Sequence, residues 1–333
     1  MSFAITQKDV FQRVVRRGQV WSRNQGVAAM AQDTEITEIV DNDGTLVGPI
    51  RRPRNAGAAG AGSIHDDETA RAVGFRGGTI AGSTHMNQFP PVLLRAFGNR
   101  WFETGSLSCY FQNATISDEP VRCFVELPPA GASDAQVKAW MEQDNGTQVL
   151  EATAAVGSPA EPTLLRRRLA APLPRGDTRI YAHLEPGMVM EPQPARTQAP
   201  DPSRLHLMTE PLDWYAGPSP WGGPIVAPGN LAQMMRRGEQ SVRRPAGSGD
   251  GQARGGGVGL FGAIEIRQIR GPVFVDHDYE VAGSVLAVGE TPKSEYFWYE
   301  SVLREPHGGK DVASMIMMIR TMKASSPLWK DQG

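Results

Sequence analysis

The 333 residues include 34 Lys+Arg and 36 Asp+Glu, which gives a formal net charge of -2. This balance argues against a general nucleic-acid-binding protein, because such proteins carry a basic excess. With 40% hydrophobic residues the chain is expected to fold, and its length favours two domains at about 150 residues each. The two cysteines, Cys109 and Cys123, exclude a disulfide framework. We therefore expect a reduced, cytoplasmic setting.

No membrane span is expected. A spanning helix needs about 20 consecutive apolar residues, and the strongest apolar run, 312–319, is far shorter. The N-terminus lacks the apolar block of a secretory signal. The six histidines show none of the short paired spacings of zinc ligands, so no metal site is expected.

Two long helices and several strands are predicted in chain order. The first helix spans about 82–97, and Pro90-Pro91 inside it predicts a kink or a break. The second spans about 229–242. Period-two alternation, typical of half-buried strands, predicts strands at 106–115, 121–127, 136–142, 147–156, 260–270, 273–281, 295–304 and 311–321. In the strand 273–281, His277 falls on the apolar face, which favours a hydrogen-bonded core histidine.

The two helices follow similar loops, Gly77-Gly78-Thr79-Ile80 and Gly222-Gly223-Pro224-Ile225, in which corresponding residues are 145 positions apart. This spacing indicates an approximate internal duplication. We expect an N-terminal repeat at 1–165, a proline-containing linker at 166–180 and a C-terminal repeat at 181–328. The element pattern predicts an α+β fold of two tandem units, each a long central helix wrapped by an antiparallel sheet.

The segment from Ser63 to Gly82 resembles the MaoC-like, (R)-specific enoyl-CoA hydratase family, whose two-repeat members have a double hotdog fold. The family motif has a histidine, a short acidic-capped helix and then a Gly-x-Pro-Ile-x-His-Gly loop. His65 precedes Ile80 by 15 residues, which fits the family spacing. In the short helix, Asp67 is expected to be the N-cap.

The sequence also departs from the family pattern. The family aspartate five residues before the histidine falls on Gly60, and the family His-Gly falls on Gly82-Ser83. The missing carboxylate would have to come from Asp66, Glu210 or elsewhere. Asp201 and His206 repeat the family Asp-to-His spacing, but too far from Pro224, so we interpret this match as accidental.

The resemblance implies reversible addition of water to a 2,3-unsaturated acyl thioester, as in fatty acid metabolism, without a metal or redox cofactor. The catalytic candidates are His65, a histidine able to move protons near neutral pH, and Asp66. The backbone around Gly82 and Ser83 is the candidate oxyanion loop, because the first turn of a helix leaves N–H donors unpaired. His85, in the same turn, is a further candidate for the pocket.

Alternatives remain open. His65 can instead be a loop histidine that is hydrogen-bonded to the backbone. The protein itself can be a non-catalytic acyl-CoA-binding or scaffold protein, or a hotdog thioesterase. The partner is expected to be an acyl-CoA or an acyl-carrier thioester, and a homodimer is favoured. Basic groups that could pair with phosphates, or be solvated surface charge, occur at Arg51–Arg54, Arg166–Arg168 and Arg236-Arg237. Trp214 and Trp221 could wall the pocket or pack between the repeats.

Overall fold

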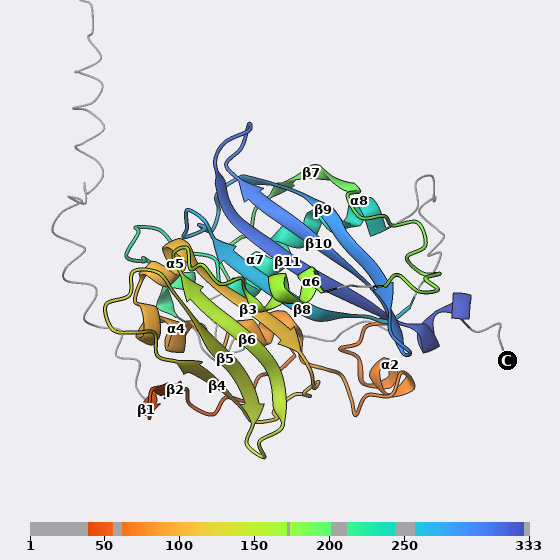
Figure 1. Cartoon of the computed structure of the whole chain (residues 1–333), viewed down its shortest axis with the longest axis horizontal. Coiled ribbons are helices and arrows are strands. Elements are labelled where there is room, and N and C mark those ends of the chain that lie inside the picture. Colours follow the sequence, from red (N-terminus) through yellow and green to blue (C-terminus); the bar gives the residue numbers. More distant parts are fainter. Residues whose placement is uncertain (1–38, 56–61, 172–173, 201–211, 244–256, 330–333) are drawn as a thin grey trace, which may run out of the picture. The chain divides into compact units, whose positions relative to one another are not determined.

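The computed structural model describes residues 39–55, 62–171, 174–200, 212–243 and 257–329. The strands of these residues form a single antiparallel sheet in the order β1-β2-β4-β5-β6-β3-β8-β11-β10-β9-β7 (Figure 1). The strands are β1 (Val40–Asn42), β2 (Thr45–Val47), β3 (Gly105–Phe111), β4 (Val121–Glu126), β5 (Ala135–Gln143), β6 (Gln148–Val156), β7 (Val189–Ala195), β8 (Gly259–Gln268), β9 (Tyr279–Glu290), β10 (Ser294–Arg304) and β11 (Asp311–Met322). The helices are α2 (Asp67–Ala72), α3 (Gly82–Met86), α4 (Pro90–Phe97), α5 (Arg100–Thr104), α6 (Leu164–Ala170), α7 (Pro228–Met235) and α8 (Gln240–Arg243), with 3-10 turns η2 (Asp213–Tyr215), η3 (Arg236–Glu239), η4 (Lys323–Ser325) and η5 (Pro327–Trp329).

The two halves of the sheet repeat one strand order about the β3–β8 pair, which we call the seam. Outward from the seam the order is β3, β6, β5, β4, β2 on one side, with the short β1 added at its edge, and β8, β11, β10, β9, β7 on the other. The seam joins the halves from Ser106↔Arg267 to Tyr110↔Ala263. This matching order agrees with the duplication expected from the sequence, while the boundaries at 165 and 181 remain predictions.

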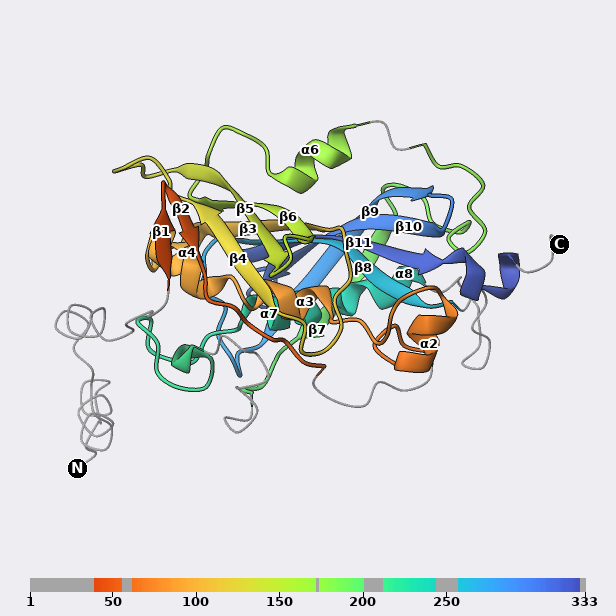
Figure 2. The same ribbon diagram turned by 90° about the horizontal axis from the view of Figure 1, so that it is seen from below.

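The central helices α3, α4 and α7 lie on one face of the sheet, and α6 lies on the other (Figure 2). Helices α3 and α7 are in direct contact, because the backbone amide of Gly229 donates a 2.7 Å hydrogen bond to Asn87 Oδ1. On the opposite face, Leu165 of α6 packs against Ala263, Trp298 and Ile316. The largest fully buried side chains of the described residues include Trp101, Tyr215, Tyr299, Phe89, Phe102 and Phe297.

The first central helix is broken, as its prolines predict. Helix α3 ends at Met86 and α4 begins at Pro90, which occupies the first helical position. Proline is tolerated there because that N–H has no intrahelical partner. The second helix continues through α7, η3 and α8 over 228–243, close to the predicted 229–242.

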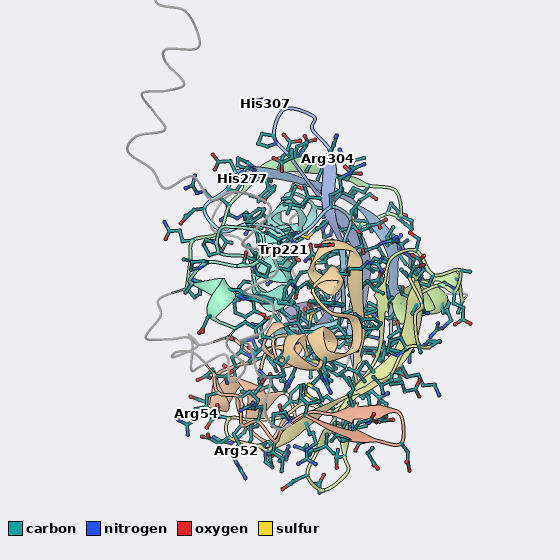
Figure 3. All side chains as sticks on the ribbon, turned by 90° about the vertical axis from the view of Figure 1, so that its left-hand side faces the viewer. Arg52, Arg54, Trp221, His277, Arg304 and His307 are labelled. Carbon is teal, nitrogen blue, oxygen red and sulfur yellow. The ribbon has the colours of Figure 1, made fainter. Side chains whose placement is uncertain are left out.

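The prediction of a strand at 273–281 is largely wrong. Residues 273–275 bond to the loop before α7 instead, through Val226 N to Val273 O at 2.8 Å and Val275 N to Pro224 O at 3.0 Å. The alternation therefore marks an extended segment with two buried valines rather than a sheet strand. The sheet strand, β9, begins at Tyr279. His277 is also not in the core: its side chain is 47% exposed and its Nε2 lies 2.9 Å from Glu305 Oε2 (Figure 3).

No helix in the described ranges has the length and apolar character that crossing a bilayer requires.

Candidate functional site

A cavity of about 820 Å³ lies beyond the last paired residues of the seam, Tyr110 and Ala263. Past this pair, the residues 111–114 on one side and 257 and 259–262 on the other belong to its lining, so each half of the sheet supplies one wall. The N-terminal repeat adds the loop 62–65 and the start of α3. The C-terminal repeat adds the end of β11 and the turn 291–294. The cavity is therefore shared between the two repeats.

His65 belongs to the lining of this cavity, as predicted for a site residue. Its Nδ1 lies 2.7 Å from the carbonyl oxygen of Thr79. A carbonyl can only accept, so Nδ1 carries the proton and, in the neutral ring, Nε2 has the free lone pair. The loop before α3 thus fixes both the orientation and the tautomer of His65, which suits a group that takes up a proton.

The two aspartates beside His65 serve the short helix α2. Asp66 is its N-cap, and its Oδ1 accepts from Thr69 N at 2.9 Å and Thr69 Oγ1 at 2.8 Å. These bonds hold the pKa of the Asp66 carboxyl below its ordinary value. The expectation that Asp67 is the N-cap is wrong by one residue, because Asp67 accepts from Gly78 N at 2.7 Å.

Neither aspartate is part of the cavity lining. Within the described residues that lining contains no Asp or Glu, and Glu210, the other expected carboxylate, lies outside them together with Asp201 and His206. The catalytic assignment of Asp66 therefore gains no support from its position.

The two residues of the expected oxyanion loop, Gly82 and Ser83, have different neighbours. Gly82 is the first residue of α3 and lines the cavity, where a Cβ would lie 2.5 Å from the ring of Phe111. Ser83 faces α7 instead, and its Oγ accepts a 3.1 Å hydrogen bond from Gln233 Nε2. Gly82 alone keeps the predicted place beside the cavity.

His85 is the second histidine of the lining. It is 3% exposed, and burial lowers its pKa to about 4. Its Nε2 lies 2.9 Å from Thr115 Oγ1, while its Nδ1 is buried and has no hydrogen-bond partner among the residues that the structure describes. The ring is therefore neutral at pH 7.

The C-terminal repeat contributes three cations to the cavity lining: Arg236, Lys293 and Arg320. Arg236 pairs with Glu239 at 2.6 Å and stacks over Phe261. Arg320 donates a 2.7 Å hydrogen bond to the Tyr110 hydroxyl. Neither Lys293 nor Arg320 has an ion-pair partner within the described part of the chain, so both remain available to an anionic group of a ligand.

The other basic groups lie elsewhere. Arg54 pairs with Asp118 at 2.6 Å, at the opposite end of the molecule from His277 (Figure 3). Arg166 pairs with Glu300 at 2.7 Å. Arg168 pairs with Glu151 and lies over the Tyr110 ring at 3.7 Å from its centroid, near the cavity.

The tryptophans Trp214 and Trp221 do not belong to the lining of the His65 cavity. They pack edge-on against Phe102, with ring centroids 6.1 and 5.9 Å away, and Trp221 Nε1 donates to Glu103 Oε1 at 2.9 Å (Figure 3). This cluster joins the two repeats, which is the packing alternative considered for it.

Metal ligands do not gather in the described ranges, where no three His, Cys, Asp or Glu side chains are placed to share an ion. Three lining residues escaped sequence reasoning: Tyr110, Lys293 and Arg320. Only the joining of the two half-sheets brings Lys293 and Arg320 to the His65 cavity, whereas Tyr110 belongs to β3 of the first half-sheet. No local motif signals any of the three.

No protein-family model and no curated protein matches the sequence. Solved structures do match the fold. A MaoC-domain protein from Chloroflexus aurantiacus J-10-fl, described as a dehydratase, aligns with a TM-score of 0.54 at 13% identity, over 84% of this chain and 94% of its own. A conserved protein from Mycobacterium tuberculosis with a double hotdog fold aligns at 0.53 and 10% identity, over 82% and 94%. The chain has a double hotdog α+β fold.

Proposed function

We propose that this chain is an acyl-thioester hydratase/dehydratase that adds water reversibly to a 2,3-unsaturated acyl thioester, an enoyl-CoA in the simplest case. The observation that carries the proposal is His65, whose Nδ1–H is bound to Thr79 O beside a cavity of about 820 Å³. A cavity of this size fits a small organic ligand. The dehydratase description of the Chloroflexus protein supports the same reaction class.

Hydration of the double bond needs a base that takes a proton from water and then gives it to carbon C2 of the acyl group. His65 Nε2 takes a proton from water as the water oxygen bonds to C3 of the acyl group. The electrons of the double bond move towards the thioester oxygen, and the same Nε2–H then protonates C2. In this step the backbone N–H of Gly82, which begins α3 beside the cavity, donates to the thioester oxygen as that oxygen gains charge.

The lining suits such a substrate at both ends. Apolar side chains from both repeats, including Ile80, Phe111, Phe261 and Ile319, line the cavity and suit an acyl chain. Lys293 and Arg320 offer positive charge to a phosphorylated carrier, since charge-assisted hydrogen bonds favour phosphate.

A second function, acyl-thioester binding without chemistry, is favoured by one observation: the described part of the lining holds no carboxylate to assist His65. The same observation weighs against a hotdog thioesterase, which needs a carboxylate to activate water at the carbonyl.

Crotonyl-CoA separates these functions. A hydratase lowers the enoyl-thioester absorbance without releasing thiol, a thioesterase releases thiol, and a binding protein only raises its melting temperature with the ligand. We expect the first result. Thiol release, or ligand binding without any absorbance change, contradicts the proposal.

The substitution His65→Ala is expected to lower kcat about 100-fold or more, since a positioned acid–base group contributes about 10²–10⁴. The matched control is His277→Ala, because His277 is an exposed histidine paired with Glu305, outside the cavity lining. Turnover of H65A at the wild-type rate would remove His65 from the mechanism.

A further inference from the structure

His85 has an unusual environment for a polar side chain. It is 3% exposed, yet its Nδ1 is buried and finds no hydrogen-bond partner in the described part of the chain. A buried polar atom left unpaired destabilises the folded protein, because it has lost its hydrogen bonds to water. Because His85 lines the cavity beside His65, a ligand in that cavity can supply the missing partner.

The partner of the other ring nitrogen decides what Nδ1 can do. His85 Nε2 lies 2.9 Å from Thr115 Oγ1. Thr115 is 1% exposed, and within the described residues its hydroxyl has no other hydrogen-bond partner. If Nε2 carried the proton and donated it to Thr115, Nδ1 would be an unpaired acceptor and the threonine O–H would be a buried donor without an acceptor in the described residues. If the threonine donates to Nε2, its O–H is no longer unpaired.

The second arrangement leaves the hydrogen on Nδ1. Burial lowers the pKa of His85 to about 4, so the ring is neutral at pH 7 and carries one N–H. Nδ1–H is then a neutral donor held in a fixed position, and it has no acceptor among the described residues.

The position of His85 on α3 places this donor near Gly82. The two residues are three positions apart in the helix, and both line the cavity, whereas Ser83 faces α7. Residues three apart share a helix face. Side chains on a helix also lean towards its N-terminus, so the ring of His85 covers the turn that begins at Gly82.

We propose that His85 Nδ1–H donates a hydrogen bond to the thioester carbonyl oxygen of the substrate, and that Thr115 is the positioning residue that fixes this tautomer. The inference rests on the proposed function and extends it: His85 becomes a catalytic donor, distinct from the proton-transferring His65.

The tautomer can be measured without any substrate. Two-bond ¹H–¹⁵N correlation spectra of the ¹⁵N-histidine-labelled protein distinguish Nδ1–H from Nε2–H for each ring, and His85→Phe assigns the signals. We expect His85 to be protonated on Nδ1 in the free wild-type protein. Protonation on Nε2 would overturn the inference, whatever the protein does to thioesters.

Kinetics with crotonyl-CoA test the role of the donor. His85→Phe is expected to lower kcat about 100-fold with a much smaller change in KM, as loss of one oxyanion donor does. Thr115→Val keeps the shape of the side chain but removes the hydroxyl, so it is expected to lower kcat severalfold and change the tautomer. Thr115→Ser keeps a hydroxyl and is expected to restore both. If H85F does not fold, the threonine pair carries the test.

The failure of each proposal has its own signature. If the wild type hydrates crotonyl-CoA and both H85F and T115V retain its kcat, the role of His85 is wrong and the hydratase proposal stands. If the wild type has no turnover, infrared spectra of bound [1-¹³C]butyryl-CoA decide the inference. A carbonyl stretch shifted down in the wild type but not in H85F supports it, and no shift contradicts it. If neither thioester is bound or turned over, the proposed function fails and the inference falls with it.

Discussion

Glu265 is a carboxylate buried at the seam, 2% exposed, on the face that α6 covers. Its Oε2 accepts hydrogen bonds from Ser108 Oγ at 2.7 Å and Thr163 Oγ1 at 2.6 Å. Burial nevertheless raises its pKa, because removing water from a carboxylate costs more than two hydroxyl donors return. Leu165 N donates to the same Ser108 hydroxyl, so this network holds α6 on the seam.

A raised pKa makes stability depend on pH with a defined sign. The folded protein binds the Glu265 proton more tightly than the unfolded chain, so this contribution is complete below the unfolded pKa and is lost as pH rises through the folded pKa. The variant Glu265→Gln should therefore gain melting temperature relative to the wild type between about pH 5 and about pH 8.

Differential scanning calorimetry at both pH values measures this gain. The matched control is Glu161→Gln, because Glu161 is exposed just before α6. An equal difference between E265Q and the wild type at both pH values would show that Glu265 does not titrate as its burial demands.

At this scale the sequence locates only part of the site. His65 and Gly82 lie in a segment that keeps the spacing of the family motif, so the sequence predicts both as candidate site residues. Asp66 is equally close in sequence, but its carboxylate bonds to Thr69, and spacing alone does not distinguish a capping aspartate from a catalytic one. Arg320 comes from the other repeat, and its place depends on strand register across the seam.

At the scale of the elements, the contact between α3 and α7 joins the two repeats on the helix face. Gly229 in α7 lies so close to α3 that a Cβ there would collide with the carbonyl oxygen of Ser83. A glycine is required where two backbones approach this closely.

The substitution Gly229→Ala is therefore expected to destabilise the fold by about 1–3 kcal/mol, the usual range for overpacking. The control is Gly223→Ala, because a Cβ at Gly223 meets only Phe274, at 3.8 Å. Urea unfolding measures both variants. A G229A protein as stable as G223A would mean that the helices separate at no cost.

The elements themselves were predictable where one pattern dominated. The break at Pro90 follows from proline chemistry, and strands such as β4 follow from strict alternation. Strand β7 escaped prediction because Pro192 and Pro194 interrupt it, which only an edge strand tolerates. The segment 273–278 was predicted as a strand because its burial against the loop before α7 produces the same alternation of apolar and polar residues as a strand.

At the scale of the whole molecule, the two repeats share one strand order but differ at the corresponding functional positions. Gly82 begins α3, whereas α7 begins with Pro228, which has no N–H to donate. At the other end of the seam, Phe102 precedes β3 and packs against Trp214 and Trp221. Aromatic side chains therefore gather at the end of the seam opposite the His65 cavity.

This difference predicts one thioester site per chain. Isothermal titration calorimetry with butyryl-CoA, a saturated thioester that cannot be hydrated, is expected to give a stoichiometry of one per chain. Two equivalent binding events per chain would contradict this prediction.

The seam has an evolutionary consequence. In a symmetric pair of identical subunits every substitution is made twice, so a change that strengthens one active centre alters its twin as well. The continuous sheet from β1 to β7 places both copies in one polypeptide. Selection can then act on each copy separately.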